Sequence, residues 1–354
     1  MSDKQTYTLP PEWHRQAFAQ LTWPDETTDW RDVLPWAQQC FVDMARAIAC
    51  REPLVIVAQS PEQVLGQLQA AHLQPETLDN IHLLACPLND TWARDHAFLT
   101  TVDEAGHVRM SDFRFNGWGN KFDADKDNAI NHTVFPQLSN LYQTLYGITT
   151  SYHAALDFVL EGGSIEVDGQ GTLLTTRHCL LTPTRNTQMN EADIINRLKQ
   201  EFGVEKVLML NHGQLEGDDT DGHIDTLARF CPDNTIAYVA CSDATDSHYL
   251  ELKAMEAELR SFTNALGQPY TLVPLPMPSE IRDDEGERLP ATYANFSVVN
   301  GAVLLPVYGQ EENDREAVSQ MRKAFPHHEI VPIDCRVLIR QHGSLHCSTM
   351  QYPM

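Results

Sequence analysis

Apolar residues recur along the chain with two alternating periods, one typical of helices and one typical of buried strands. Residues 32–50 follow the helical period of about 3.6, with apolar side chains at Val33, Trp36, Ala37, Cys40, Phe41, Met44 and Ile48. Residues 54–58 form a short continuous apolar run, which predicts a buried strand. Ser60 then precedes Pro61, a pair typical of a helix start, and this helix is predicted to continue to about Ala71.

The same alternation continues through the rest of the chain. Helices are predicted over residues 137–146, 190–202, 247–262 and 311–324, the second capped by Asn190 and ended by Gly203. Strands are predicted over residues 81–86, 158–160, 171–176, 207–210, 236–240, 270–273, 298–307, 329–333 and 336–339. Residues 1–28 carry turn signals and are predicted to be irregular, and Asn300-Gly301 is predicted to turn the chain inside the run 298–307.

This order of elements predicts an α/β or α+β fold, because helices separate strand pairs from end to end. The 354 residues contain no low-complexity linker and no break in composition. We therefore expect one continuous domain, residues 1–354. Several strand–helix–strand units share a pattern, but no repeat can be read in the residues themselves.

The chain is strongly acidic, with 49 Asp and Glu against 25 Lys and Arg and a formal net charge of −24. Such a surface disfavours nucleic acid and anionic membranes as partners. It favours a small cationic ligand through electrostatic steering, although acidity can also simply keep a protein soluble. The N-terminus carries no apolar signal segment, no apolar run is long enough to span a membrane, and none of the eight cysteines forms a C-x-x-C pair. These features predict a reduced, cytoplasmic protein.

In two short segments, polar residues occupy positions that the periodic pattern would leave apolar, which makes these segments candidates for a functional site. Residues 89–95 directly follow the strand predicted over 81–86 and end in Asp95, at the kind of strand end where α/β proteins place functional loops. Glu161 precedes a glycine pair that lets the backbone approach closely. The alternative for Asp95 is a surface ion pair with Arg94, and the alternative for the glycine pair is a plain turn. The glycine pair lacks both G-x-G-x-x-G and a Walker lysine, so it does not predict a nucleotide loop.

A third acidic stretch, residues 217–230, places His223 and Asp225 on either side of Ile224. On a strand both side chains would point to one face, and a histidine beside a carboxylate is typical of general acid–base chemistry. A solvated acidic loop is the alternative. A calcium loop aligned on Gly222 would need ligands where Gly217 and Ala228 stand, and H-E-x-x-H is absent.

Cys347 stands near the end of the sequence among small polar residues, and a buried thiol is the simplest interpretation. Together with a histidine and several carboxylates, however, a thiol suits attack on a guanidinium carbon. The planar guanidinium matches carboxylates bidentately, whereas such carboxylates would repel the oxyanion of a thiol protease. On an extended segment His346 would point away from Cys347, so proton transfer is expected from the distant His223.

Five ordered motifs carry a resemblance to a known family: Thr91-Trp92-Ala93-Arg94-Asp95, Phe115-Asn116-Gly117-Trp118-Gly119, Leu160-Glu161-Gly162-Gly163, residues 222–230 and Gly343-Ser344-Leu345-His346-Cys347. Together they resemble the bacterial agmatine deiminases of the Porphyromonas-type peptidylarginine deiminase family, within the guanidino-modifying pentein superfamily. The resemblance extends from Trp23-Pro24 to Cys347. It implies a five-bladed α/β propeller with the active site in its central channel.

The resemblance also implies roles for single residues. Cys347 matches the nucleophile, His223 the general acid and base, and Glu161 the acid that orients the histidine and contacts the substrate. Asp95 and Asp225 match the carboxylates that grip the guanidinium. Trp92 and Trp118 match aromatic positions along the substrate chain, and Asp219 is a candidate for holding the distal ammonium of agmatine. His342-Gly343-Ser344-Leu345 departs from the glycine run and asparagine of many members, which bears on substrate preference.

The implied reaction converts agmatine to N-carbamoylputrescine and ammonia through a covalent adduct on Cys347, with no metal or organic cofactor. A deiminase of free or peptidyl arginine, an amidinotransferase and a non-catalytic binding scaffold are the alternatives. A homodimer is expected from the general frequency of such assemblies.

Overall fold

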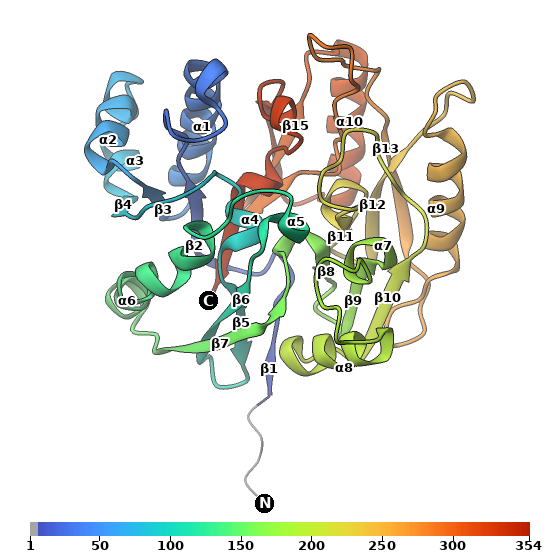
Figure 1. Cartoon of the computed structure of the whole chain (residues 1–354), viewed down its shortest axis with the longest axis horizontal. Helices are drawn as coiled ribbons and strands as arrows, with labels where there is room; N and C mark the ends of the chain where they lie inside the picture. The colour runs from blue at the N-terminus through green and yellow to red at the C-terminus, as the bar shows by residue number, and fades with distance from the viewer. Residues whose placement is uncertain (1–5) are drawn as a thin grey trace, which may run out of the picture.

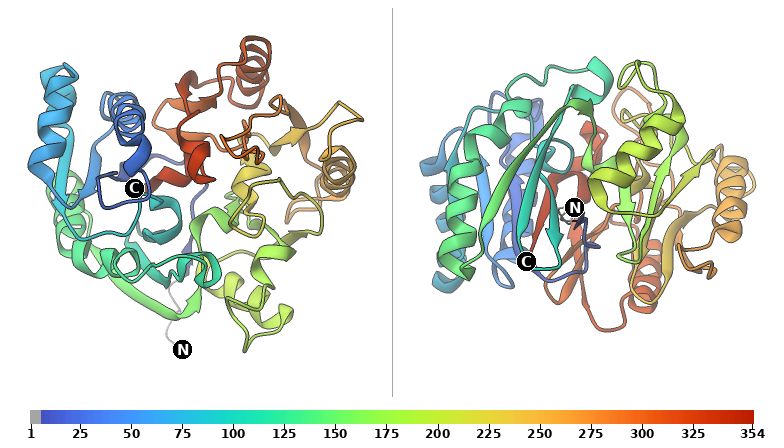
Figure 2. Two further views of the ribbon diagram at one scale, coloured as in Figure 1. Left: turned by 45° about the horizontal axis from the view of Figure 1, so that its top comes forward. Right: turned by 90° about the horizontal axis from the view of Figure 1, so that it is seen from below.

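The computed structural model describes residues 6–354, so residues 1–5, part of the segment predicted to be irregular and to lack a signal, lie outside it. The described strands form five separate sheets of three or four strands. Figures 1 and 2 show these sheets around a common centre, with the long helices on the outside and the short helix α4 (Ala93–His96) near the middle.

Four sheets repeat one unit of strand, strand, helix and strand, in which the first two strands are antiparallel and the third is parallel to the second. The first unit comprises β5 (Leu99–Asp103), β6 (Val108–Arg114), α6 (Asp127–Tyr146) and β7 (Thr150–Val159), with β1 (Tyr7–Thr8) added beside β5. The second comprises β8 (Ile165–Val167), β9 (Thr172–Thr176), α8 (Glu191–Phe202) and β10 (Lys206–Leu210). The third comprises β11 (Ala228–Cys231), β12 (Thr235–Ala240), α9 (Tyr249–Ser261) and β13 (Thr271–Pro276), and the fourth β14 (Ser297–Val299), β15 (Ala302–Val307), α10 (Glu311–Ala324) and β16 (Glu329–Asp334).

The fifth sheet joins segments from opposite ends of the sequence. β17 (Thr349–Pro353) pairs antiparallel with β2 (Gln16–Thr22), and β2 is parallel to β3 (Leu54–Ala58) after helix α1 (Leu34–Ala49). Helices α2 (Pro61–Ala70) and α3 (Pro75–Asp79) and strand β4 (Ile81–Ala85) extend this sheet outward. The unit is thus the same in all five sheets, which confirms the five-bladed α/β propeller.

Local chemistry explains the helices that the sequence predicts well. Helix α8 begins with a capping box, in which Asn190 and Asp193 bond reciprocally, and ends at Gly203 in the left-handed conformation. Helix α10 has the predicted limits, with acidic residues in its first turn and basic residues in its last. The turn at Asn300-Gly301 joins β14 to β15 as predicted. Ser60 precedes α2, but its side chain makes no capping hydrogen bond.

Several predictions of elements are wrong, including the strand predicted over 158–160, which begins at Thr150 in β7. Three others have a clear physical reason. Residues 1–28, predicted to be irregular, contain the completely buried strand β2. Its polar side chains break the apolar pattern that would predict a strand; the Gln16 amide, for example, donates to the Val298 carbonyl at 2.7 Å. Helix α6 begins ten residues before the predicted start at 137, because it continues through Pro136. Residues 336–339 form no strand: Leu338–Gln341 is a 3₁₀ turn with Leu338 and Ile339 buried.

The buried apolar side chains pack mainly between each sheet and the helix that covers it, which leaves the middle of the ring to polar groups. Among residues 6–354 no helix has the length and hydropathy to cross a bilayer.

Candidate active site

Four of the predicted site residues come from equivalent places in four of the five blades, just before the first strand of each unit. Asp95 and Glu161 each stand four residues before β5 and β8, and Asp225 stands three before β11. Cys347 stands two residues before β17, and Asn295 holds the same place before β14. Because these first strands are buried towards the centre, the pseudo-symmetry brings five distant segments to one point.

A cavity of about 680 Å³ opens at this point. Its lining includes five of the eight predicted residues: Trp92, Asp95, Trp118, Asp219 and Cys347. The exposed carboxylates of Asp29 and Asp123 also line it, as do Lys121 and Lys126. The other three predicted residues, Glu161, His223 and Asp225, are fully buried.

Gly163 marks the point where the predicted polar groups converge. A Cβ atom placed on Gly163 would lie 2.6 Å from His223 Nδ1, 2.9 Å from Asp95 Oδ1 and 3.0 Å from Asp225 Oδ2. The Gly163 backbone N–H donates to Asp95 Oδ1 at 2.9 Å. The glycine pair of the sequence therefore serves close approach, and it holds one carboxylate from the backbone.

Asp95 accepts a second hydrogen bond at 2.9 Å, from the Trp118 indole N–H to Oδ2. Trp118 has a left-handed backbone (φ 53°), an uncommon conformation for a bulky residue, and its ring packs edge-on against Phe115 and Phe122. Burial raises the pKa of Asp95 to about 6, although His223 and the indole N–H act in the opposite direction. The site thus holds a carboxylate that a cationic partner would stabilise.

His223 lies with Nδ1 at 3.6 Å from Asp95 Oδ1, and its backbone N–H donates to the Thr220 hydroxyl at 3.0 Å. Burial alone would lower its pKa, but Asp95, followed by Cys179 and Glu161, outweighs this and raises the pKa to about 10. These neighbours therefore favour the protonated, imidazolium form of His223. Residues 224–226 form a 3₁₀ turn (η3) rather than a strand. This turn nevertheless directs His223 and Asp225 to the same point, as a strand would have done.

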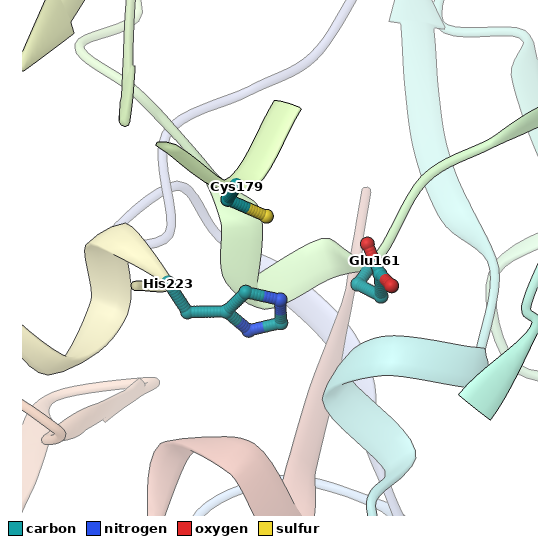
Figure 3. Close-up of side chains that lie close together, drawn as sticks. All are labelled: Glu161, Cys179 and His223. Atoms are coloured by element: carbon teal, nitrogen blue, oxygen red, sulfur yellow. The ribbon is translucent and has the colours of Figure 1, made fainter. Parts of the chain in front are cut away.

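Glu161 has a partner that the sequence did not indicate. The Arg185 Nε–H donates to both Glu161 carboxylate oxygens at 2.9 Å, and Arg185 also donates to Asp221 Oδ2 at 2.7 Å. A carboxylate oxygen of Glu161 and a ring nitrogen of His223 lie within 4.8 Å of one another (Figure 3). Arg185 stands in the Pro-Thr-Arg-Asn loop after Leu180, where nothing in the pattern distinguishes it from a surface arginine.

Cys347 lies in the 3₁₀ turn η5 (His346–Ser348), 4% exposed, at the inner wall of the cavity. Its Sγ is 3.3 Å from Asn295 Nδ2 and 3.7 Å from Asp225 Oδ2. Burial, and then the charges of Asp225 and Asp95, raise the thiol pKa well above its usual value. The sequence did not indicate Asn295 either. Had the fivefold repeat been recognised in the sequence, the position of Asn295 before the first strand of the fourth blade would have identified it.

The segment at His346 is not extended as expected, although Cys347, and not His346, is the residue that lines the cavity. The 3₁₀ turn replaces the expected extended backbone and aims the ring between two carboxylates. Nδ1 lies 2.8 Å from Asp225 Oδ2, and Nε2 lies 2.8 Å from Glu12 Oε2. Glu12 is also paired with the buried Arg229. Burial alone would raise the pKa of Asp225, but the hydrogen bond from His346, together with the charges of His346, His223 and Arg229, lowers that pKa.

The remaining predicted residues line the outer cavity. Trp92 is buried against Trp30, with ring centroids 5.6 Å apart, and Gly343 packs so tightly on the Trp92 ring that a Cβ atom would collide with it. Position 343 therefore requires a glycine, although the surrounding loop, residues 342–345, departs from the family's glycine run and asparagine. The Asp219 side chain is 43% exposed and lies with Oδ2 3.7 Å from His342 Nδ1.

Comparison with known proteins agrees with this arrangement. The family description "Porphyromonas-type peptidyl-arginine deiminase" matches residues 8–353. A solved protein from Porphyromonas gingivalis is 47% identical, with a TM-score of 0.89 and 99% of each chain covered. The agmatine deiminase of C. jejuni, solved with substrate bound, is 35% identical, with a TM-score of 0.88, covering 100% of this chain and 98% of that one. The agmatine deiminase of Stutzerimonas stutzeri is 32% identical over 98% of this chain and 95% of its own length.

A propeller with a thiol, a histidine and paired carboxylates at its centre defines a guanidino-modifying enzyme of the pentein class. Within that class, the chain belongs to the Porphyromonas-type peptidyl-arginine deiminase family.

Proposed function

We propose that this enzyme hydrolyses the guanidinium group of agmatine to N-carbamoylputrescine and ammonia. The observation that carries the proposal is the placement of Cys347 Sγ at 3.7 Å from Asp225 Oδ2, on a cavity that Asp95 also lines. Two carboxylates next to a thiol suit a planar cation whose carbon the sulfur attacks. Relatives of similar length that are named agmatine deiminases support this choice of substrate.

In the proposed mechanism Asp95 and Asp225 bind the guanidinium nitrogens and orient its carbon. The substrate's positive charge offsets the two carboxylates, lowers the thiol pKa of Cys347 and favours the nucleophilic thiolate. The sulfur bonds to the guanidinium carbon, His223 donates a proton to one nitrogen, and the C–N bond breaks to release ammonia. His223 then takes a proton from water, whose oxygen attacks the adduct. Breakage of the C–S bond releases the ureido product and restores the sulfur.

Other residues position these groups. Glu161, held by Arg185, supplies negative charge beside His223, whereas Asp95 is the carboxylate nearest to the ring. His346 holds Asp225 from the side opposite the cavity, and Trp118 holds Asp95. Trp92 and the carboxylate of Asp219 line the outer cavity, where the alkyl chain and the distal ammonium would lie.

Arginine is the second candidate, because Lys121 and Lys126 line the same cavity and could meet an α-carboxylate. Lys121, however, is already bound to the Asp219 carbonyl and to Asp221 Oδ1. The exposed carboxylates of Asp29, Asp123 and Asp219 favour a substrate that ends in an amine.

Ammonia release from agmatine, free arginine and a blocked arginine peptide tests the proposal. We expect agmatine to have the highest kcat/KM, and a preference for either arginine substrate would overturn the assignment. Intact mass during turnover should show an adduct that Cys347→Ala abolishes and that Cys50→Ala, at an exposed thiol, leaves intact. We also propose a single catalytic domain in a reducing cytoplasm, which the eight free cysteines support.

A further inference from the structure

A second buried thiol lies beside the proposed catalytic histidine. Cys179, in helix α7 (Arg177–Leu180), is fully buried and takes no part in the mechanism above. Its Sγ, a ring nitrogen of His223 and a carboxylate oxygen of Glu161 all lie within 4.8 Å of one another. Figure 3 shows the three side chains converging from three separate segments. Thiolate, imidazole and carboxylate are the ligand types that Zn²⁺ selects, whereas Mg²⁺ and Ca²⁺ prefer oxygen alone.

An independent observation is the state of the His223 ring. Within residues 6–354 neither ring nitrogen has a hydrogen-bond partner, although the residue is fully buried. The nearest carboxylate oxygen, Asp95 Oδ1, is 3.6 Å from Nδ1, which is too long for a hydrogen bond. Leaving a buried polar atom unpaired costs free energy. A metal ion would displace the imidazolium proton of His223 and the thiol proton of Cys179, both of which would be released to solvent. The deprotonated ring then has ligand capacity on the side that Cys179 and Glu161 occupy.

We propose that Glu161, Cys179 and His223 bind a thiophilic divalent cation, with Zn²⁺ as the reference ion. Tetrahedral zinc with bonds of about 2.0–2.3 Å holds its ligand atoms roughly 3.5 Å apart. Atoms already within 4.8 Å of one another reach that spacing by small side-chain rotations. Arg185 does not prevent binding, because one Glu161 oxygen can retain the Arg185 Nε–H while the other ligates the ion. The fourth position is left to water.

The ion would reach the site through the acidic cavity, since Asp95 both lines the cavity and lies beside His223. A bound cation would occupy a ring nitrogen and repel the guanidinium, so we infer that it inhibits the enzyme in competition with substrate. This consequence rests on the proposed function, whereas ion binding itself does not.

Chelator-treated, full-length protein titrated with Co²⁺ tests the binding. Tetrahedral Co²⁺ bound to a thiolate gives a sulfur-to-metal charge-transfer band, and Zn²⁺ should displace it at one ion per chain. Cys179→Ser should weaken Co²⁺ affinity roughly 100-fold or more, since even an outer partner of a metal ligand is worth about 10–100-fold. Cys50→Ser, at an exposed thiol, and Cys347→Ser, at the other buried thiol of the centre, should retain the band. Far-UV circular dichroism checks that each variant is folded, and His223→Asn provides a second ligand deletion.

Loss of the band in Cys347→Ser with retention in Cys179→Ser would overturn the proposal, as would the absence of a saturable site with one ion per chain. In ammonia-release assays, Zn²⁺ should raise KM for agmatine, and Cys179→Ser should need at least about tenfold more Zn²⁺ for the same effect. The binding titration contains no substrate. If the enzyme does not release ammonia from agmatine, the result of the Co²⁺ titration still stands. If the protein does not bind the ion, the proposed reaction still stands.

Discussion

The Nδ1 atom of His346 lies 2.8 Å from Asp225 Oδ2, and the opposite ring nitrogen lies 2.8 Å from Glu12 Oε2. The histidine next to the proposed nucleophile therefore bridges two buried carboxylates. It connects Asp225, the proposed guanidinium ligand, to the Glu12–Arg229 ion pair behind it. This bridge makes the ionisation of Asp225 depend on a residue that does not line the cavity.

Replacing His346 by Phe should reduce kcat/KM by about 10–100-fold, since a hydrogen bond to a charged group is worth roughly 1.5–3 kcal/mol and about 1.4 kcal/mol is tenfold. Because His346 lowers the pKa of Asp225, its loss should also make the acid limb of the pH profile steeper, since Asp225 would then begin to be protonated together with Asp95. His212→Phe removes a half-exposed histidine that also faces a carboxylate, and it should change neither quantity. An acid limb of unchanged steepness in His346→Phe would show that His346 does not control the ionisation of Asp225.

The pH profile of kcat/KM for the metal-free enzyme should be bell-shaped. Asp95, with a pKa of about 6, must be ionised to bind a cation, so kcat/KM should fall as pH drops below that value. His223, with a pKa of about 10, must be protonated to assist departure of ammonia, so kcat/KM should fall as pH rises above it. Initial rates at low agmatine concentration between pH 5 and pH 11 measure both limbs. A flat profile from pH 5 to 7 would remove Asp95 from substrate binding.

Asp225→Asn should have opposite effects on turnover and on thiol reactivity. Turnover should fall by far more than about tenfold, because the buried guanidinium loses its carboxylate partner. Alkylation of Cys347 by iodoacetamide should accelerate, since the charge of Asp225 raises the thiol pKa. Peptide mapping of the alkylated protein gives the rate, and Asp284→Asn, at a carboxylate on the surface, is the matched control. Slower alkylation in Asp225→Asn would contradict this electrostatic account.

Gly163→Ala should abolish activity while the protein stays folded. The added methyl would need the space now held by His223 Nδ1, Asp95 Oδ1 and Asp225 Oδ2, and a misplacement of about 1 Å can cost 100-fold. Gly66→Ala is the control, because nothing lies within 4 Å of its Cβ position in helix α2. That control should keep full activity and gain about 0.4–1 kcal/mol of stability. Steady-state kinetics and thermal unfolding of both variants provide the comparison, and near-native turnover in Gly163→Ala would show that the three groups can move freely.

The outer helices could be predicted from the sequence because one face meets a sheet and the other meets solvent, as in α10. The inner strands could not. β2 is buried along its whole length and reads as polar, because Gln16 donates from its amide nitrogen to the Val298 carbonyl and Gln20 accepts from the Tyr352 hydroxyl inside the protein. Short 3₁₀ turns such as η3 leave no periodic signal at all.

Most of the predicted site residues were visible because they stand in motifs that contain glycine, tryptophan or histidine, as Glu161 does before Gly162 and Cys347 does after His346. Asn295 and Arg185 have no such setting. Asn295 follows Tyr293-Ala294 and Arg185 follows Thr184, in segments that resemble ordinary loops. Only the spatial repeat of the five blades identifies Asn295, and only the buried pairing with Glu161 identifies Arg185.

Thr349 pairs with Leu21, which stands 328 positions earlier in the sequence (349 − 21). Closing so long a loop is costly in chain entropy, and folds rich in such distant contacts fold slowly. Apart from the short strand β1, the other four blades consist of strands that are near neighbours in the sequence, so they can assemble before the ring closes. Cys347 stands two residues before the closing strand. During refolding, catalytic competence should therefore return last, after most of the secondary structure has re-formed.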